Sequence, residues 1–313
     1  MRHARVLPAL FSDEPQQIIT VVCGSGNELL SHDPQRPIIT QLVPRRLHVP
    51  SLADLDTDPA GKLALPSDQA HHARNVLRLS DGDTVELFDD AGRVATGILR
   101  MAGRAGQWEA WAEVRSIANP PDGVAAGSPG GRLVVASAIP KGDRADWMVE
   151  KLSELGVAAW IPLITARGVV VPPGGECSGG NKAQRWRRLA VESAKQSRRT
   201  GVMVVGEAMP LAKAVSGPDA GAMRVVLEPG AATPLAGLAQ RAHEHAATTL
   251  LIGPEGGWAP DELVMLAEAG VRQARLTRGT VLRIETAAVA AAAVWLCGGP
   301  PSEAQAHAHP GES

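Results

Sequence analysis

Hydrophobic and polar residues alternate along much of the first half of this chain of 313 residues. The alternating segments are short and lie at residues 46–49, 62–65, 84–88, 93–100 and 108–117. Alternation is typical of strands that bury one face, and the turn at Asp90-Ala91-Gly92 joins two of the segments. The pattern predicts a small β-barrel over residues 43–118.

One helix is predicted inside this barrel region. Ser67 is a suitable N-cap, and the segment ends before the turn Asp81-Gly82. Apolar residues recur at partly helical spacing, at Ala70, Ala73, Val76, Leu77 and Leu79. We therefore expect a single helix to interrupt the strands.

The second half of the chain contains continuous apolar runs instead of alternating ones. They lie at residues 133–138, 158–163, 202–205, 224–227, 249–252 and 274–276, with helical patterns between them. Strands that are apolar throughout are buried on both faces, as in a parallel sheet covered by helices. We predict an α/β domain with a mostly parallel sheet over residues 132–297.

Three segments lack sustained periodicity. Residues 1–42 hold one apolar run followed by Gly24-Ser25-Gly26, which imitates the start of a dinucleotide-binding fold, but Leu29 stands where the third glycine belongs. Residues 119–131 are rich in Pro, Gly and Ser. We predict a disordered extension at 1–42, a linker at 119–131 and a disordered tail at 298–313.

Composition narrows the classes of function. A formal net charge of -2 gives no general attraction to nucleic acid, so any RNA binding must come from a local basic patch. The chain has neither a membrane-length apolar run nor the ordered sections of a signal peptide, so we expect a cytoplasmic protein. The cysteines (Cys23, Cys177, Cys297) are isolated and the paired histidines do not share a helix face, so we predict no metal site.

The strongest chemical signal is LLIGPEGG at residues 250–257, a buried strand that runs into a glycine-rich turn. A helix is predicted to begin near Pro260, although Ala259 is a poor cap. Because glycine has no Cβ, such a turn lets the backbone approach a ligand closely. A cofactor site and a tight turn without a ligand both fit this segment.

A second signal is TVLRIETA at residues 280–287, which leads into an alanine-rich helix reaching about residue 296. Arg283 and Glu285 flank an apolar residue near the start of this helix. They fit either a structural ion pair or polar groups directed into a cleft.

A third signal is the basic segment 182–199, in which seven basic residues accompany one acidic residue, Glu192. Its small and apolar residues fall on one helix face, at Trp186, Leu189, Ala190, Ser193, Ala194 and Ser197. Arg185, Arg188, Lys195 and Arg199 spread over the other face. The excess of one sign favours contact with phosphates over a merely solvated face, and both interpretations stay open.

Five motifs follow one another in a recognisable order: KGDR at 141–144, EKLSELG at 150–156, the segment 192–199, LIGPEGG at 251–257 and VLRIETA at 281–287. In order and spacing they resemble the ribosomal RNA small subunit methyltransferase E family, which methylates the N3 atom of a uracil in 16S rRNA. RRLHV at 45–49 and HARNVLRLSDG at 72–82 resemble that family's PUA-like RNA-binding domain. The resemblance covers residues 43–297.

The resemblance implies a SPOUT catalytic domain with a deep trefoil knot, S-adenosyl-L-methionine (SAM) held in the knot, and a homodimer. It implies SAM contacts at Leu227, Glu228, Gly253, Pro254, Glu255, Gly256, Gly257, Thr277, Gly279, Val281 and Leu282. The candidate RNA-binding residues are Arg45, Arg46, His72, Arg78, Lys141, Arg144, Arg185, Arg188, Lys195, Arg198 and Arg199. The chain departs from the family at Thr277-Arg278-Gly279, where Leu-Gly-Pro is usual.

The expected reaction is methyl transfer to N3 of a uridine in 16S rRNA during maturation of the small ribosomal subunit. The uracil nitrogen is a weak acid, so its proton must leave before or during transfer. Glu285 or Glu255 would accept the proton, and Arg283 would stabilise negative charge on the uracil oxygens. A SPOUT enzyme acting on a ribose or another base, and a non-catalytic RNA-binding or ribosome-assembly protein, are the alternatives.

Overall fold

The computed structural model describes residues 44–53, 61–104, 107–118, 132–168, 181–216 and 222–298. The predicted extension at 1–42 and the predicted linker at 119–131 lie outside these ranges, as does the predicted tail after Gly298. The described residues belong to one compact unit, Pro44–Ser313. Within it the chain forms two separate sheets.

The first sheet has five strands in the order β1-β3-β4-β5-β2. They are β1 (Arg45–His48), β2 (Lys62–Ala64), β3 (Thr84–Phe88), β4 (Val94–Arg104) and β5 (Gln107–Ala118). β1 pairs with β3 in parallel, and the other pairs are antiparallel. All five strands coincide with predicted alternating segments, and their buried residues form a core of their own, except Phe88 of β3, which packs in the core of the second sheet.

The predicted helix of this region is α1 (Ser67–His71), which continues into a π-helical segment, η2 (His72–Val76). The prediction of Ser67 as N-cap is wrong by one residue. Pro66 occupies the cap position with φ -52° and ψ 146°, and Ser67 is the first helical residue. Proline suits the start of a helix because the first backbone N–H groups have no partner within the helix, so the missing N–H of proline is not a loss there.

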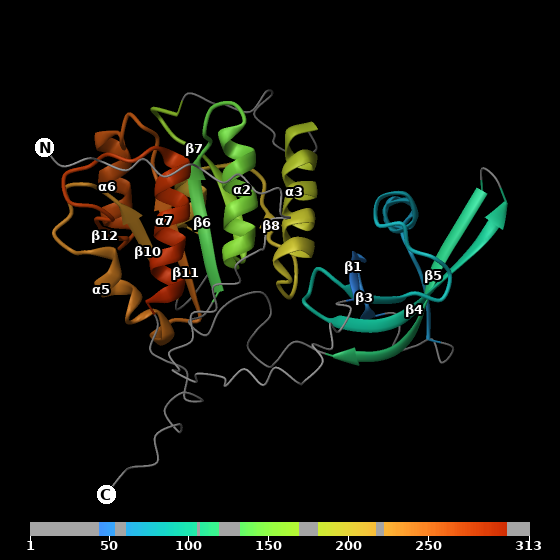
Figure 1. The fold of residues 1–313 in the computed structure, drawn as a ribbon. Helices are drawn as coiled ribbons and strands as arrows, with labels where there is room; N and C mark the ends of the chain where they lie inside the picture. The colour runs from blue at the N-terminus through green and yellow to red at the C-terminus, as the bar shows by residue number, and fades with distance from the viewer. Residues whose placement is uncertain are drawn as a thin grey trace, which may run out of the picture. The chain divides into compact units, whose positions relative to one another are not determined.

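The second sheet has seven strands, with β12-β10-β11-β6-β7-β8 in order and β9 paired to β7. Every pair in it is parallel. The strands are β6 (Arg132–Ala138), β7 (Ala159–Ile164), β8 (Val204–Val205), β9 (Met209–Pro210), β10 (Met223–Leu227), β11 (Ala247–Ile252) and β12 (Arg272–Ala274). The predicted parallel α/β sheet is confirmed (Figure 1).

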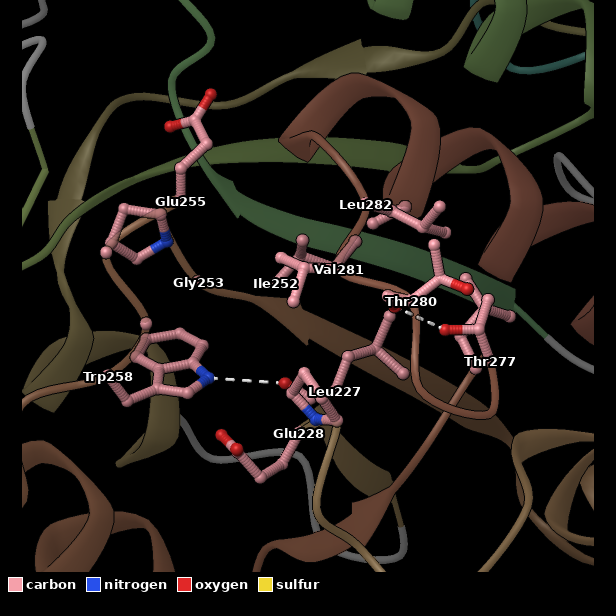
Figure 2. Close-up of a pocket in the computed structure, with 16 residues that line it drawn as sticks. Leu227, Glu228, Ile252, Gly253, Glu255, Trp258, Thr277, Thr280, Val281 and Leu282 are labelled. Atoms are coloured by element: carbon pink, nitrogen blue, oxygen red, sulfur yellow. Dashed lines mark hydrogen bonds between the residues drawn. The ribbon is translucent and has the colours of Figure 1, made fainter.

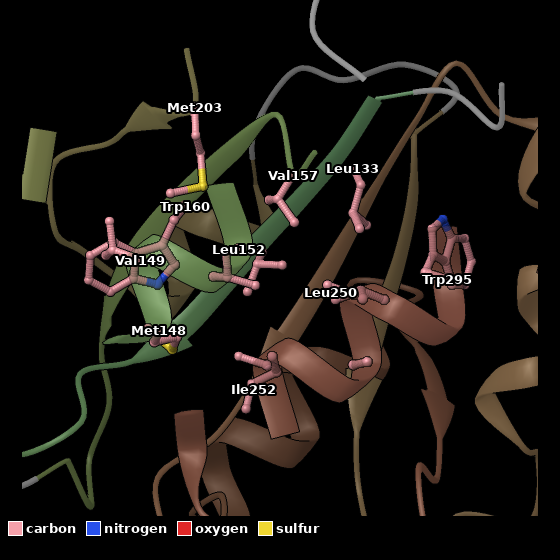
Figure 3. Close-up of a cluster of buried hydrophobic side chains, with 14 of the residues drawn as sticks. Leu133, Met148, Val149, Leu152, Val157, Trp160, Met203, Leu250, Ile252 and Trp295 are labelled. Atoms are coloured by element: carbon pink, nitrogen blue, oxygen red, sulfur yellow. The ribbon is translucent and has the colours of Figure 1, made fainter. Parts of the chain in front are cut away.

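Helices cover both faces of this sheet. They are α2 (Arg144–Leu155), α3 (Asn181–Ser197), α4 (Leu211–Val215), α5 (Leu235–Ala239), η3 (Ala242–Glu244), α6 (Pro260–Glu268) and α7 (Ile284–Cys297). Leu250 and Ile252 of β11 pack with α2, α3, α5 and α7, whereas Leu251 packs with α4 and α6. Figure 3 shows part of the larger core. Successive side chains of a strand point to opposite faces of the sheet and so enter different cores. This is why the strands of this sheet are apolar throughout.

Candidate functional site

A cavity of about 270 Å³ lies where β10, β11 and β12 end. The carboxyl ends of parallel strands meet at one edge of a sheet, which is where α/β folds bind ligands. Three loops surround the cavity, at residues 227–229, 252–258 and 276–282 (Figure 2). Two of the strongest sequence signals, LIGPEGG and VLRIETA, therefore meet in one place.

Ten of the predicted cofactor residues line this cavity: Leu227, Glu228, Gly253, Pro254, Glu255, Gly256, Gly257, Thr277, Val281 and Leu282. Gly279 does not line it. Its φ of +79° gives it a turn role, because that conformation is strained for other residues. The Thr277 hydroxyl closes the same turn by donating to Thr280 O at 2.6 Å. The departure Thr277-Arg278-Gly279 thus forms a closed local turn beside the cavity.

Trp258 is a cavity residue that the sequence analysis missed. Its indole N–H donates to Leu227 O at 3.4 Å, which links the loop after β11 to the loop after β10. A Cβ placed on Gly253 would lie 2.8 Å from the Trp258 ring. Glycine is therefore required at residue 253 by the packing of the protein itself. The sequence did contain a sign of this role, because Trp258 is an aromatic residue directly after the glycine turn.

One guanidinium joins the two predicted catalytic carboxylates. Arg144 Nη1 lies 3.4 Å from Glu285 Oε1 and 3.8 Å from Glu255 Oε1. The side chain of Glu255 is 40% exposed and that of Glu285 only 8%. Glu285 Oε2 is buried without a hydrogen-bond partner among the described residues. A buried carboxylate oxygen without a donor is costly, so this position is unusual for a purely structural side chain.

Arg283 takes the N-cap position of α7 and is exposed. The ion pair that the sequence left open between Arg283 and Glu285 is not found within the described ranges, where Glu285 pairs with Arg144 instead. Arg283 follows Val281 and Leu282, both of which line the cavity. Its side chain is therefore available to a group that approaches from outside.

The candidate RNA-binding residues separate into three groups by burial. The exposed group comprises Arg45, Arg78, Lys141, Arg185, Arg188 and Arg198. Arg144 and His72 are half-buried, and the side chain of Lys195 is only 8% exposed, with its Nζ 2.8 Å from Glu192 Oε1. Partial burial, and then the positive charge of Lys195, lower the pKa of His72, which disfavours the charged form of this ring. The third group consists of Arg46 and Arg199, whose guanidinium groups bond to other groups of the protein.

Arg46 is in the interior, and this corrects its assignment to RNA. Its Nε lies 2.7 Å from Glu86 Oε1, its Nη1 donates to Ala194 O at 3.1 Å, and its guanidinium stacks 4.1 Å from the centroid of Phe88. Desolvation on burial lowers the pKa of Arg46, while Glu86 opposes this change. The side chain joins β1 and β3 to the end of α3.

Arg199 is the second correction. The helix predicted to reach residue 199 ends at Ser197, and Arg198 has a φ of 56° that turns the chain away. Arg199 Nη1 consequently points inward and donates to Ser153 O at 2.9 Å and Val157 O at 3.0 Å. Burial lowers its pKa to about 10. The guanidinium is therefore still charged at neutral pH and is held by carbonyls of the protein.

Two general features bear on the class of site. No group of three His, Cys, Asp or Glu residues suited to a metal ion occurs within the described ranges. In the same part of the chain, every helix is too short or too polar to cross a membrane. The cavity itself is lined by the glycine turn and by two acidic side chains, Glu228 and Glu255.

Comparison with known proteins identifies relatives for both sheets. Residues 128–296 match a family described as an RNA methyltransferase domain, and residues 65–104 match an RNA methyltransferase PUA domain. The ribosomal RNA small subunit methyltransferase E of Mycobacterium bovis is 32% identical over 240 residues, covering 75% of this chain and 86% of the relative. The protein of the same name from Synechocystis is 28% identical over 237 residues, covering 74% and 71%.

Solved structures agree with this similarity. A ribosomal RNA small subunit methyltransferase E from Neisseria gonorrhoeae, bound to SAM, superposes with a TM-score of 0.66 at 26% identity and covers 80% of this chain and 95% of its own. A methyltransferase of Legionella pneumophila in complex with SAM gives a TM-score of 0.67 at 24% identity, covering 82% and 98%. The second likeness supports the fold alone.

Proposed function

Because this chain belongs to the ribosomal RNA small subunit methyltransferase E family, we propose that it transfers a methyl group from SAM to N3 of a uridine in 16S rRNA. The observation that carries the proposal is the cavity at the ends of β10, β11 and β12. Its walls are the three segments that the resemblance assigns to SAM. VLRIETA and the PUA-like domain favour the uracil base over a ribose.

The residues around the cavity fit SAM. The backbones of 253–257 and 277–282 offer amide and carbonyl groups, and Leu227 and Leu282 add apolar surface suited to an adenine ring. Glu228 contributes a carboxylate that suits the hydroxyl and ammonium groups of the cofactor. The charge of the lining also supports SAM over an anionic nucleotide, because acidic side chains and not basic ones line the cavity among the described residues.

Bound SAM supplies an electrophilic methyl group with a good leaving group. The protein has to hold an unstacked uridine with N3 in line, exclude water and take up the N3 proton. We assign proton uptake to Glu255, because it lines the cavity and is exposed enough to meet a base. Arg144 connects it to Glu285, which we place behind the reacting groups. Arg283 stabilises the negative charge that develops on the uracil oxygens.

Primer extension on 16S rRNA tests this proposal. A methyl group at N3 removes the donor used in Watson–Crick pairing, so reverse transcriptase should stop at one uridine after incubation with protein and SAM. Glu255→Gln should remove the stop, and Glu285→Gln should weaken it less. Methyl incorporation without a stop would favour a ribose methyltransferase. Failure of the protein to bind SAM in a titration would favour the non-catalytic RNA-binding alternative.

The proposal includes a homodimer, the trefoil knot and a cytoplasmic location. The family resemblance implies the dimer, and Val281, just before α7, is an apolar residue that is 72% exposed. Sedimentation velocity at micromolar concentration should give a species of twice the chain mass. A stable monomer with full activity would contradict the dimer. The cytoplasmic location is supported by the proposed substrate, which is ribosomal RNA.

A further inference from the structure

An arginine that the sequence analysis did not single out reaches the rim of the cavity. Arg167 lies in the loop after β7, and its Nη1 donates to Gly256 O at 2.9 Å. A Cβ placed on Gly256 would lie 3.5 Å from Arg167 Cβ and 3.7 Å from its Cδ. The arginine side chain therefore packs along the glycine turn, in contact with a residue that lines the cavity.

A buried glutamate holds this loop in place. Glu262 is 6% exposed, and its Oε1 accepts a hydrogen bond from Ala166 N at 2.8 Å. Its Oε2 accepts from Ala259 N, also at 2.8 Å, at the start of α6. One carboxylate thus fixes the residue before Arg167 to the segment that follows the glycine turn. The position of Arg167 is set by the same unit that forms the cavity wall.

The charge of Arg167 is not neutralised by its surroundings. The residue is exposed, and within the described ranges no carboxylate lies within ion-pair distance of it. Arg144, in contrast, is paired with Glu255 and Glu285. A guanidinium has five N–H donors, and the contact with Gly256 O uses one of them. Arg167 therefore has donors and charge available for an anion.

We propose that Arg167 binds a phosphodiester of the RNA beside the nucleotide that is methylated. The inference rests on the proposed function. When the target base enters toward the cavity, its phosphates remain outside, at the rim where Arg167 lies. The planar guanidinium matches the geometry of a phosphate, and a charge without a carboxylate partner loses no ion pair on binding it. Arg167 is thus a substrate-positioning residue.

A purely structural role makes a different prediction. If Arg167 served only to fix Gly256, its loss would loosen the glycine turn and weaken SAM binding while leaving RNA affinity unchanged. If it binds phosphate, its loss weakens RNA binding and leaves SAM affinity unchanged. The two roles are therefore separated by measuring both ligands on the same variant.

The test compares Arg167→Ala and Arg167→Lys with Arg132→Ala, a matched loss of an exposed arginine at the amino end of β6, opposite the cavity. RNA affinity is measured by anisotropy with a labelled 16S rRNA fragment at several salt concentrations, and SAM affinity by calorimetry. Arg167→Ala should weaken RNA binding about tenfold and reduce the salt slope by about one. It should raise KM for RNA more than it lowers kcat. Arg167→Lys should keep the slope, because its charge remains, and lose part of the affinity.

Arg132→Ala should behave as wild type. An unchanged RNA affinity and salt slope in Arg167→Ala, or a loss of SAM affinity in its place, would overturn the proposal. If wild-type protein binds the RNA but transfers no methyl group, the proposed function fails. The salt slope then still reports whether Arg167 contacts phosphate.

Discussion

Two regions of the molecule place arginine in different surroundings: the rim of the cavity, and the contact of β1 with the end of α3. At the rim, Arg167 and Arg283 are exposed beside loops that line the cavity. At the contact, Arg46 and Arg199 have their guanidinium groups in the interior, bonded to backbone carbonyls. Arginine is accessible to a ligand in the first region. In the second region its guanidinium is already hydrogen-bonded within the protein.

The comparison shows what a basic residue contributes in each setting. A buried guanidinium has lost its hydration, so it stabilises the fold only while carbonyls and carboxylates satisfy it. An exposed guanidinium adds little to stability but keeps its donors for a ligand. We therefore expect substitutions at the rim to change reaction and RNA binding, and substitutions at the contact to change the free energy of unfolding.

The largest effect is expected at the rim. Arg283→Ala should lower kcat for rRNA methylation by a factor on the order of 100 or more, because in the proposed reaction it removes the donor that stabilises charge developing in the transition state. SAM affinity should stay within about tenfold, and the melting temperature should hardly change. Single-turnover methylation with labelled SAM provides the rate. An Arg283→Ala enzyme at full rate would remove this residue from the chemistry.

A substitution at the contact of β1 with the end of α3 should lower the free energy of unfolding. Arg46→Met leaves Glu86 without its partner and two carbonyls without a donor, so the free energy of unfolding should fall by about 3 kcal/mol. Urea unfolding followed by circular dichroism measures this. The salt slope of RNA binding, recorded under conditions where the variant is folded, should equal that of wild type. A slope reduced by about one would return Arg46 to the RNA-binding surface.

A smaller change at the cavity tests its packing. Gly253→Ala adds a methyl group that would lie 2.8 Å from the Trp258 ring, so the ring or the turn must shift. SAM affinity should fall by about tenfold. Gly230→Ala is the matched control, because a Cβ there meets nothing within 4 Å. Equal SAM affinity in both variants would mean that the contact of Trp258 with Gly253 does not shape the binding site.

The smallest effect concerns two basic side chains of α3. Replacing Arg188 and Lys195 together with Ala should reduce the salt slope of RNA binding by about two if both contact phosphates. Lys195 is paired with Glu192, so a reduction closer to one is also informative, since it assigns the contact to Arg188. An unchanged slope would make this helix face merely solvated.

Much of the fold was predictable because the hydrophobic period differs between the two halves. The alternating segments became the first sheet, whose pairs are antiparallel except for β1 with β3, and the continuous runs became a sheet with helices on both faces. Short elements were missed. β9 has two residues and α4 and α5 five each, too few for a period to appear.

The site was predictable where a motif carries its own geometry, as at residues 253–257 and 281–282. The roles of single arginines were not. Arg199 and Arg188 look equivalent in a basic helix, but the helix ends before Arg199 and turns it inward. Arg167 contacts Gly256 O, and Glu262 accepts from Ala166 N, because the fold brings the loop after β7 against the segment after β11. Such long-range contacts leave no pattern in a single sequence.

The central claim is that the cavity methylates a uracil base of 16S rRNA, and nucleoside analysis tests it most directly. Unmodified 16S rRNA is incubated with wild-type protein and SAM carrying an isotopically labelled methyl group, then digested to nucleosides and separated by liquid chromatography with mass spectrometry. We predict that the label appears as 3-methyluridine and is lost in Arg283→Ala. Label in a 2′-O-methyl nucleoside, or in another base, would contradict the account.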